Sequence, residues 1–419
     1  MKLQSLTGVV FAAWLAWTGL AKGADSNLDG EDFASANQLA IASMNLVQEI
    51  KFELDDAIRS RTCQQEIIDK LQADFSGALN RAAPKLERAL SLVTDADDRQ
   101  EVRSARLRSA YANFWLRKNY EAAVLAENVA RNADAADGAL AHDCAYLVFK
   151  SLYQAFQDQR FPVGQRGQDL QLMIGAYHKL AEHWPDSYRV TEAVMILGSL
   201  HDQEQAHADA AKWYGKIAPS NSLYPAAQIR TGQSYMNAYN NASRLAVSQK
   251  PAPVQFSAWL NAAYDHLRVG VDAMSKEVPN DSVAKDLLWN KFQLSQVALC
   301  LGHDAEALKL LLDEPNVLIA AVAISDGVGG SEKDIRSRRI ALEYHVRKFR
   351  AYMGLGKIEL ADETLSKSIA AFDDSEITEM LSQLEGYMQK LRENGEIESH
   401  LRLKKSFEAL QKKLASAGK

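Results

Sequence analysis

Apolar residues recur every three to four positions along most of this chain, the spacing that places them on one face of an α-helix. The first such run begins near residue 32 and continues through Met44, Val47, Leu54 and Ile58. A second runs from Ile67 to Leu79 and a third through residues 86–92. The periodicity predicts helix after helix and no strand.

Acidic residues mark one expected helix start. The stretch at residues 95–98 contains Asp95, Asp97 and Asp98. Carboxylates are stabilised at the positive N-terminal end of a helix dipole, so a new helix is expected to follow this stretch.

A regular spacing appears in the middle of the chain. Gly198 and Gly232 both interrupt helical patterns and lie 34 residues apart, with Ala210, Tyr214 and Pro225 between them. Such a unit is expected to be two antiparallel helices, in which glycine allows close approach, alanine fits the tightest contact and tyrosine fills the gap. One hairpin cannot bury its apolar face alone, so copies should stack.

These residues resemble the tetratricopeptide repeat (TPR) family, most closely over residues 189–235. Weaker copies surround that stretch, and the resemblance extends with interruptions from about residue 105 to 372. The upstream copies place Tyr120, Ala123, Ala130, Tyr177, Leu180 and the stretch 184–187 at family positions, although Tyr111 stands where glycine is usual. Downstream, Gly302 and Gly356 are expected in turns, with Ala307 and Ala361 in the following helices.

The predicted fold is therefore all-α, a right-handed α-solenoid of antiparallel helix hairpins with helical N- and C-terminal caps. We expect an N-terminal helical segment at residues 24–104, a TPR-like solenoid at 105–372 and C-terminal helices at 373–419. The C-terminal helices either cap the solenoid or pair with another subunit. Loops are expected to interrupt the solenoid at residues 161–167, 248–254 and 325–331.

Residues 1–23 are expected to be a signal peptide. Lys2 precedes an apolar run at residues 6–20, and Ala21 and Gly23 supply small residues for cleavage. The run is shorter than the roughly 20 residues that span a bilayer, although an uncleaved anchor stays open. We therefore expect export to the periplasm and no membrane span after cleavage.

Composition fits a folded protein with an acidic surface. Hydrophobic residues make up 47% and charged residues 24%, which excludes a disordered chain. The net charge is −6, and losing Lys2 and Lys22 with the signal segment makes it −8. An acidic surface without basic clusters argues against nucleic acid as a partner. Cys63, Cys144 and Cys300 are expected to be small buried hydrophobes, with one disulfide still open.

No motif for catalysis, a metal or a cofactor stands out. The nine histidines lack the four-residue spacing that places two rings on one helix face. No Gly-x-Ser-x-Gly elbow occurs. The glycines at residues 327–330 are followed by no Lys-Ser or Lys-Thr pair at the spacing of a phosphate-binding loop. We therefore predict that the chain is not an enzyme and holds no cofactor.

The TPR resemblance implies a partner-binding groove on the concave face. By position in the family pattern, the residues facing it would be Arg108, Trp115, Met195, Asp202, Gln203, Met236 and Asn237. Peptide-binding members hold a terminal carboxylate with lysine and asparagine. Here only Arg108 is suitable, and Ala112 stands where asparagine would be needed, so that clamp is not expected.

The predicted function is a non-enzymatic interaction scaffold of the cell envelope that binds a protein or peptide. The repeat pair also looks like exported TPR proteins that serve outer-membrane assembly and cell-division coordination. Two alternatives stay open: an exported helical-toroid enzyme acting on polysaccharide, and a solenoid carrier that encloses a small ligand or glycan.

Overall fold

The computed structural model describes residues 32–60, 64–132, 138–158, 163–245, 248, 251–276, 281–312, 331–371 and 397–417, with short stretches between 378 and 393. Throughout these ranges the regular secondary structure is helical apart from short turns, and no strand occurs in them. The predicted signal segment, residues 1–23, lies outside the described residues, as does Cys63.

The chain divides into two compact units, Met1–Ala193 and Val194–Lys419. In the first unit the helices are α2 (Phe33–Arg59), α3 (Gln65–Ser91), α4 (Arg99–Trp115), α5 (Asn119–Arg131), α6 (Gly138–Gln157) and α7 (Val163–His183). Helix α8 (Tyr188–Gln203) contains the boundary. The second unit continues with α9 (His207–Tyr214), α10 (Tyr224–Ser243), α11 (Pro253–Met274), α12 (Asp281–Cys300), α13 (Asp304–Leu312), α15 (Ser331–Gly354), α16 (Ile358–Ala371) and α18 (Ile397–Ala417).

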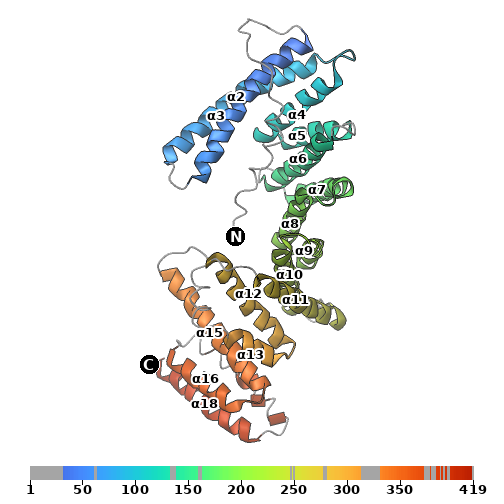
Figure 1. Cartoon of the computed structure of the whole chain (residues 1–419). Coiled ribbons are helices and arrows are strands. Elements are labelled where there is room, and N and C mark those ends of the chain that lie inside the picture. Colours follow the sequence, from blue (N-terminus) through green and yellow to red (C-terminus); the bar gives the residue numbers. More distant parts are fainter. Residues whose placement is uncertain are drawn as a thin grey trace. The chain divides into compact units, whose positions relative to one another are not determined.

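Within each unit, helices pack mainly against their neighbours in sequence (Figure 1). This nearest-neighbour packing is that of an α-solenoid, so the predicted all-α solenoid of helix hairpins is confirmed. The chain is a helical repeat protein. The finer boundaries at residues 24–104, 105–372 and 373–419 stay predictions.

The N-terminal helices begin where the sequence places them. Asp32 caps α2 by accepting a hydrogen bond of 2.8 Å from the backbone N–H of Ser35. Asp98 caps α4 in the same way, with bonds of 2.7 and 3.0 Å from Gln100 and Glu101. A side-chain acceptor at this position satisfies N–H groups that have no partner inside the helix, which confirms the acidic stretch as a helix start.

One expectation for this region is wrong. The apolar runs at residues 67–79 and 86–92 belong to the single helix α3, which contains Pro84. Pro84 is exposed, whereas Leu79, Ala82 and Leu86 are buried on the opposite side. Proline removes one backbone donor, but the continuous apolar face keeps both halves of α3 packed against α2.

The expected loops need correction as well. Residues 163–167 form the first turns of α7 rather than a loop. Residues 161 and 162 of the expected loop lie outside the described residues, and α7 begins at Val163. Pro253 likewise begins α11, so the second break is shorter than expected. The third, residues 325–331, lies outside the described residues except Ser331, which begins α15.

Four hairpins close through the same type of turn. After α4, α8, α12 and α15, a backbone N–H bonds to the carbonyl five residues earlier at 2.8–2.9 Å. The residue before that N–H has a left-handed backbone, with φ of 62° at Arg117, 60° at Gln205, 78° at Gly302 and 66° at Gly356. This bonding pattern is a Schellman turn, which glycine favours because it lacks Cβ. The turns at Gly302 and Gly356 were predicted, whereas those at Arg117 and Gln205 carry no glycine to reveal them.

Close helix contacts explain the 34-residue glycine spacing. A Cβ added at Gly198 would lie 2.5 Å from Cε1 of Tyr214, whose side chain is fully buried. A Cβ at Gly232 of α10 would lie 2.9 Å from the backbone oxygen of Ala263 and 2.9 Å from the nitrogen of Leu267, both on α11. The packing roles predicted for the glycines and for Tyr214 are therefore confirmed.

We predict that Gly232→Ala lowers the free energy of unfolding by about 1–3 kcal/mol, because the backbone of α11 has to move away. Gly175→Ala in α7 is the matched control, since a Cβ there meets nothing within 4 Å. Alanine should stabilise that helix by up to about 1 kcal/mol. Urea unfolding of both variants measures the difference, and equal effects would contradict the close approach.

The Schellman turns give a second prediction. Arg117→Gly should raise the free energy of unfolding by up to about 1 kcal/mol, because it relieves a left-handed non-glycine residue. Gly302→Ala should lower it by about 1 kcal/mol, and a Cβ at Gly302 meets nothing within 4 Å, so only backbone conformation is tested. Thermal unfolding that shows the same sign for both substitutions would contradict the assignment.

Candidate partner-binding face

The seven residues predicted to line a groove lie on the first helices of hairpins. Arg108 and Trp115 are on α4 in the first unit. The other five lie in the second unit, on α8 and α10: Met195, Asp202, Gln203, Met236 and Asn237. The structure therefore describes them as separate sets, one in each unit.

The α4 residues are partly enclosed by packing. Trp115 is half-buried and packs at the edge of the α2–α3 core, with its ring 5.7 Å from that of Phe75 and 5.8 Å from that of Tyr111. Arg108 is half-buried too, and burial lowers the pKa of its guanidinium. Much of the Trp115 indole is therefore occupied by contacts within the unit.

Asp202 ties three helices of the second unit together. Ser234 of α10 donates to its two carboxylate oxygens at 3.0 and 2.8 Å, and His207 Nδ1 of α9 lies 2.9 Å from Oδ1. Burial raises the pKa of Tyr214 to about 12, and Asp202 contributes to that shift. This arrangement gives Asp202 a structural role that its sequence position did not reveal.

The remaining predicted residues of this set differ in exposure. Met236 is buried in the core of the second unit, and Met195 is half-buried. Gln203 and Asn237 are exposed. Of the predicted set in this unit, only these two amides offer freely accessible side chains to a partner.

The exposed Asn237 belongs to a row of amide side chains on α10 and α12. This amide row consists of Gln233 and Asn237 on α10 and Gln293 on α12. Gln233 donates from Nε2 to Gln293 Oε1 at 2.8 Å and to Asn290 Oδ1 at 3.3 Å. Gln233 lies four residues before Asn237, so the two share one face of α10. Sequence reasoning missed this row because neutral amides form no motif. The available signal was the position of Gln233 directly after the repeat glycine Gly232.

A charged cluster joins α6 to the start of α8 in the first unit, and sequence reasoning missed it too. Arg189 is buried, forms an ion pair with Asp143 and lies 5.1 Å from the ring centre of Tyr146. Lys150 Nζ lies 3.5 Å from Glu192 Oε1. Burial raises the pKa of Tyr146 well above its ordinary range, with Glu192 as the next contribution. The groups of this cluster neutralise one another and so act mainly as links between helices.

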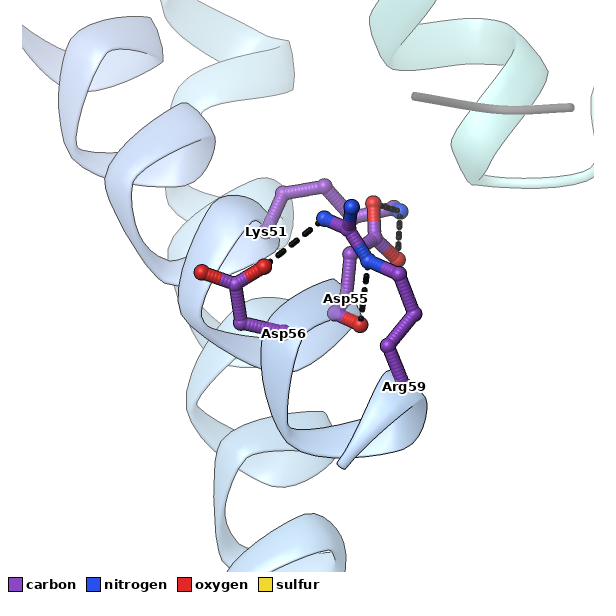
Figure 2. Close-up of polar contacts among 4 residues, drawn as sticks. All are labelled: Lys51, Asp55, Asp56 and Arg59. Carbon is purple, nitrogen blue, oxygen red and sulfur yellow. Dashed lines mark hydrogen bonds and ion pairs between the residues drawn. The ribbon is translucent and has the colours of Figure 1, made fainter. Parts of the chain in front are cut away.

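Four charged residues at the end of α2 form a third polar group (Figure 2). Lys51 bonds to both carboxylate oxygens of Asp55 at 2.6 and 2.5 Å, and Arg59 pairs with Asp56 at 2.8 Å. All four belong to one helix at three- and four-residue spacing, where ion pairs stabilise by only a few tenths of a kcal/mol. Arg59 also lies favourably in the last turn. The group is explained by helix stability and suggests no ligand.

Neither metal nor membrane chemistry emerges from the described ranges. They contain no group of three or more His, Cys, Asp or Glu side chains placed to hold a metal ion. None of the helices in these ranges combines the length and apolarity needed to cross a bilayer. Cys144 is buried, and burial raises the pKa of its thiol to about 12.

Comparisons with known proteins leave the family open. No protein-family model and no curated protein matches the chain. A solved circular tandem repeat protein, described as having a novel repeat topology and enhanced subunit contact surfaces, is similar over 91% of this chain and 85% of its own. Its identity to this chain is 13% and its TM-score is 0.20. A TM-score that low supports no argument about the fold, so the fold is assigned from the packing of the helices alone.

The contacts of Asp202 predict that this residue stabilises the fold, although the sequence assigns it to the partner-binding groove. Asp202→Ala should lower the free energy of unfolding by about 1–3 kcal/mol, because Ser234 and His207 lose a charged partner. Gln203→Ala, on the same helix and exposed, should change it by less than about 0.5 kcal/mol. Chemical unfolding of the two variants tests this. Equal stabilities would mean that Asp202 is available for a partner.

Two half-buried histidines predict acid sensitivity of the second unit. Burial lowers the pKa of His201 and of His266 below the ordinary value of 6.5. A lowered histidine pKa means that the folded state favours the neutral ring. The stability from these rings is thus present above pH 6.5 and is lost as the pH falls below it. Urea unfolding between about pH 7.5 and about pH 5 should show this loss, and the double variant His201→Gln/His266→Gln should reduce it.

Proposed function

We propose that this protein is a non-enzymatic interaction scaffold of the TPR type, exported to the cell envelope, that binds an extended polypeptide through the first-helix face of its hairpins. The observation that carries the proposal is the amide row of Gln233, Asn237 and Gln293 on α10 and α12. Both helices come first in their hairpins, the layer that the TPR resemblance assigns to the concave face.

The amide row has the chemistry that an extended chain requires. Each residue of a polypeptide presents one backbone donor and one acceptor, and each Gln or Asn side chain offers both kinds of group. Such recognition depends on the backbone of the partner more than on its side chains. The acidic character of the whole chain also disfavours nucleic acid as the partner.

The TPR assignment itself draws on several features. Hairpins close by a repeated Schellman turn, and Gly198 and Gly232 lie at close contacts with the spacing expected of the family. The envelope location draws only on the sequence of residues 1–23. Cleavage of that segment and export are therefore part of the proposal.

Site-specific photocrosslinking in a cell-envelope preparation tests the binding face. A photoreactive amino acid replaces Asn237 on α10, and the matched control replaces Asn261, which is exposed on the second helix α11. We expect a discrete polypeptide adduct from position 237 that is much weaker from position 261. Gln233→Ala should weaken that adduct without lowering Tm by more than a few degrees.

Two outcomes would overturn this proposal. Equal crosslinking from positions 237 and 261 would mean that the first-helix face has no preference. Absence of a polypeptide adduct, together with a Tm increase on adding a glycan or another small molecule, would favour the carrier, since a ligand that binds only the folded state raises stability.

A further inference from the structure

Acidic residues are absent from one long stretch of the second unit. From residue 210 to residue 264 the sequence contains no Asp or Glu, although these two residue types occupy 54 of the 419 positions. The same stretch contains five Lys and Arg residues and includes the whole of α10. A chain whose net charge is −6 therefore carries one long segment of net positive charge.

The solvent side of α10 carries a regular order of side chains. Arg230, Gln233, Asn237, Asn241 and Arg244 follow one another at three- and four-residue steps, so they share one face of the helix. Arg244 is the C-cap, and its φ of −84° and ψ of −10° continue that face. None of the five is among the buried residues of α10. This α10 stripe places one arginine at each end of a run of neutral amides.

The two arginines of the α10 stripe are not neutralised by the described part of the chain. Arg230 and Arg244 form no ion pair with any carboxylate in the described ranges. The carboxylate of Asp202 on the neighbouring α8 is engaged by Ser234 instead, at 3.0 and 2.8 Å. Arg230 keeps its guanidinium carbon 5.8 Å from the ring centre of the buried Tyr214. A guanidinium presents a planar fork of donors that matches a carboxylate.

We propose that the α10 stripe selects an acidic segment of the extended polypeptide, in which two carboxylates lie about six residues apart. Residues 230 and 244 are separated by about 21 Å along the helix, at roughly 1.5 Å per residue. An extended chain covers that distance in about six residues. Each arginine binds one carboxylate, and the amides between them bond to the peptide backbone. This partner chemistry rests on the proposed function, since it describes the polypeptide that the amide row binds.

The charge of the remaining chain favours an acidic polypeptide over a nucleic acid. A nucleic acid carries a negative charge at every nucleotide, so the acidic regions outside residues 210–264 would repel it. A peptide with two separated carboxylates needs only the two arginines, and its neutral backbone between them matches the donors and acceptors of the amides. Charge pairs at such a surface act mainly on the choice of partner.

Selection from a display library of random peptides of about twelve residues tests the proposal on the full-length protein. We expect the enriched sequences to carry two Asp or Glu residues about six positions apart. Fluorescence anisotropy then measures the affinity of individual enriched peptides. Arg244→Gln should weaken binding about two- to fivefold. Arg230→Gln/Arg244→Gln should weaken it further, and the differences should shrink at about 0.5 M salt.

A matched pair of lysines controls for charge alone. Lys212→Gln/Lys216→Gln removes two exposed cations of the same acid-free stretch, on α9 and directly after it, and should leave peptide binding unchanged. If Arg230→Gln lowers Tm because it loses its contact with Tyr214, the exposed Arg244 carries the test alone. Arg244→Glu should then weaken binding more than Arg244→Gln does, because it adds repulsion.

Three results would overturn the proposal: no enrichment, enriched peptides without paired acids, or equal binding to the wild type and to Arg230→Gln/Arg244→Gln. These failures are distinguishable from failure of the proposed function. Enriched peptides without acids that still lose affinity in Gln233→Ala would leave the binding face in place and remove only the acidic preference. The photocrosslink from position 237 decides the proposed function without reference to either arginine.

Discussion

Close approach between paired helices is the constraint on which the rest of this structure depends. Gly232 lies so near the backbone of α11 that even a methyl group would require a shift, and Ala210 and Ala263 are fully buried. Small residues allow the helices to come together, and larger ones, such as Tyr214, fill the space that remains. Packing of this kind transmits strain readily, since protein interiors are as dense as organic crystals.

Some polar side chains on the first helices are engaged in contacts between helices and are therefore less available to a binding partner. Asp202 occupies a position that the family pattern assigns to a binding groove, yet it accepts bonds from Ser234 and faces His207. The buried Arg189 and the half-buried Asp143 similarly neutralise each other in an ion pair. The exposed amides Gln203 and Asn237 have no such structural role. They are the better guides to a partner, because changing them leaves the helices in place.

Periodicity and glycine spacing made the fold predictable, but not the face that binds. Helical periodicity follows from the burial of one helix face, so the sequence predicted α2 and the helices of residues 189–235. Helix α3 was predicted as two separate runs. It is one helix because its apolar stripe continues past Pro84 and packs against α2 on both sides of the proline. The turns at Arg117 and Gln205 were not predicted, because neither contains glycine and the hydrogen bonds that stabilise a left-handed residue involve only the backbone. The Gln233–Gln293 contact joins residues 60 apart, a distance over which local pattern carries no signal.

Nearest-neighbour packing also has a consequence for how the chain reaches its structure. Contacts between successive helices join residues that are close in sequence, which keeps the mean sequence separation of contacts low. Chains with low contact order search less conformational space before native contacts form, and they fold faster than proteins built from distant pairings. Each hairpin of this protein can thus begin to form as soon as its own two helices are available, and a fault in one hairpin delays its neighbours more than the remainder of the chain.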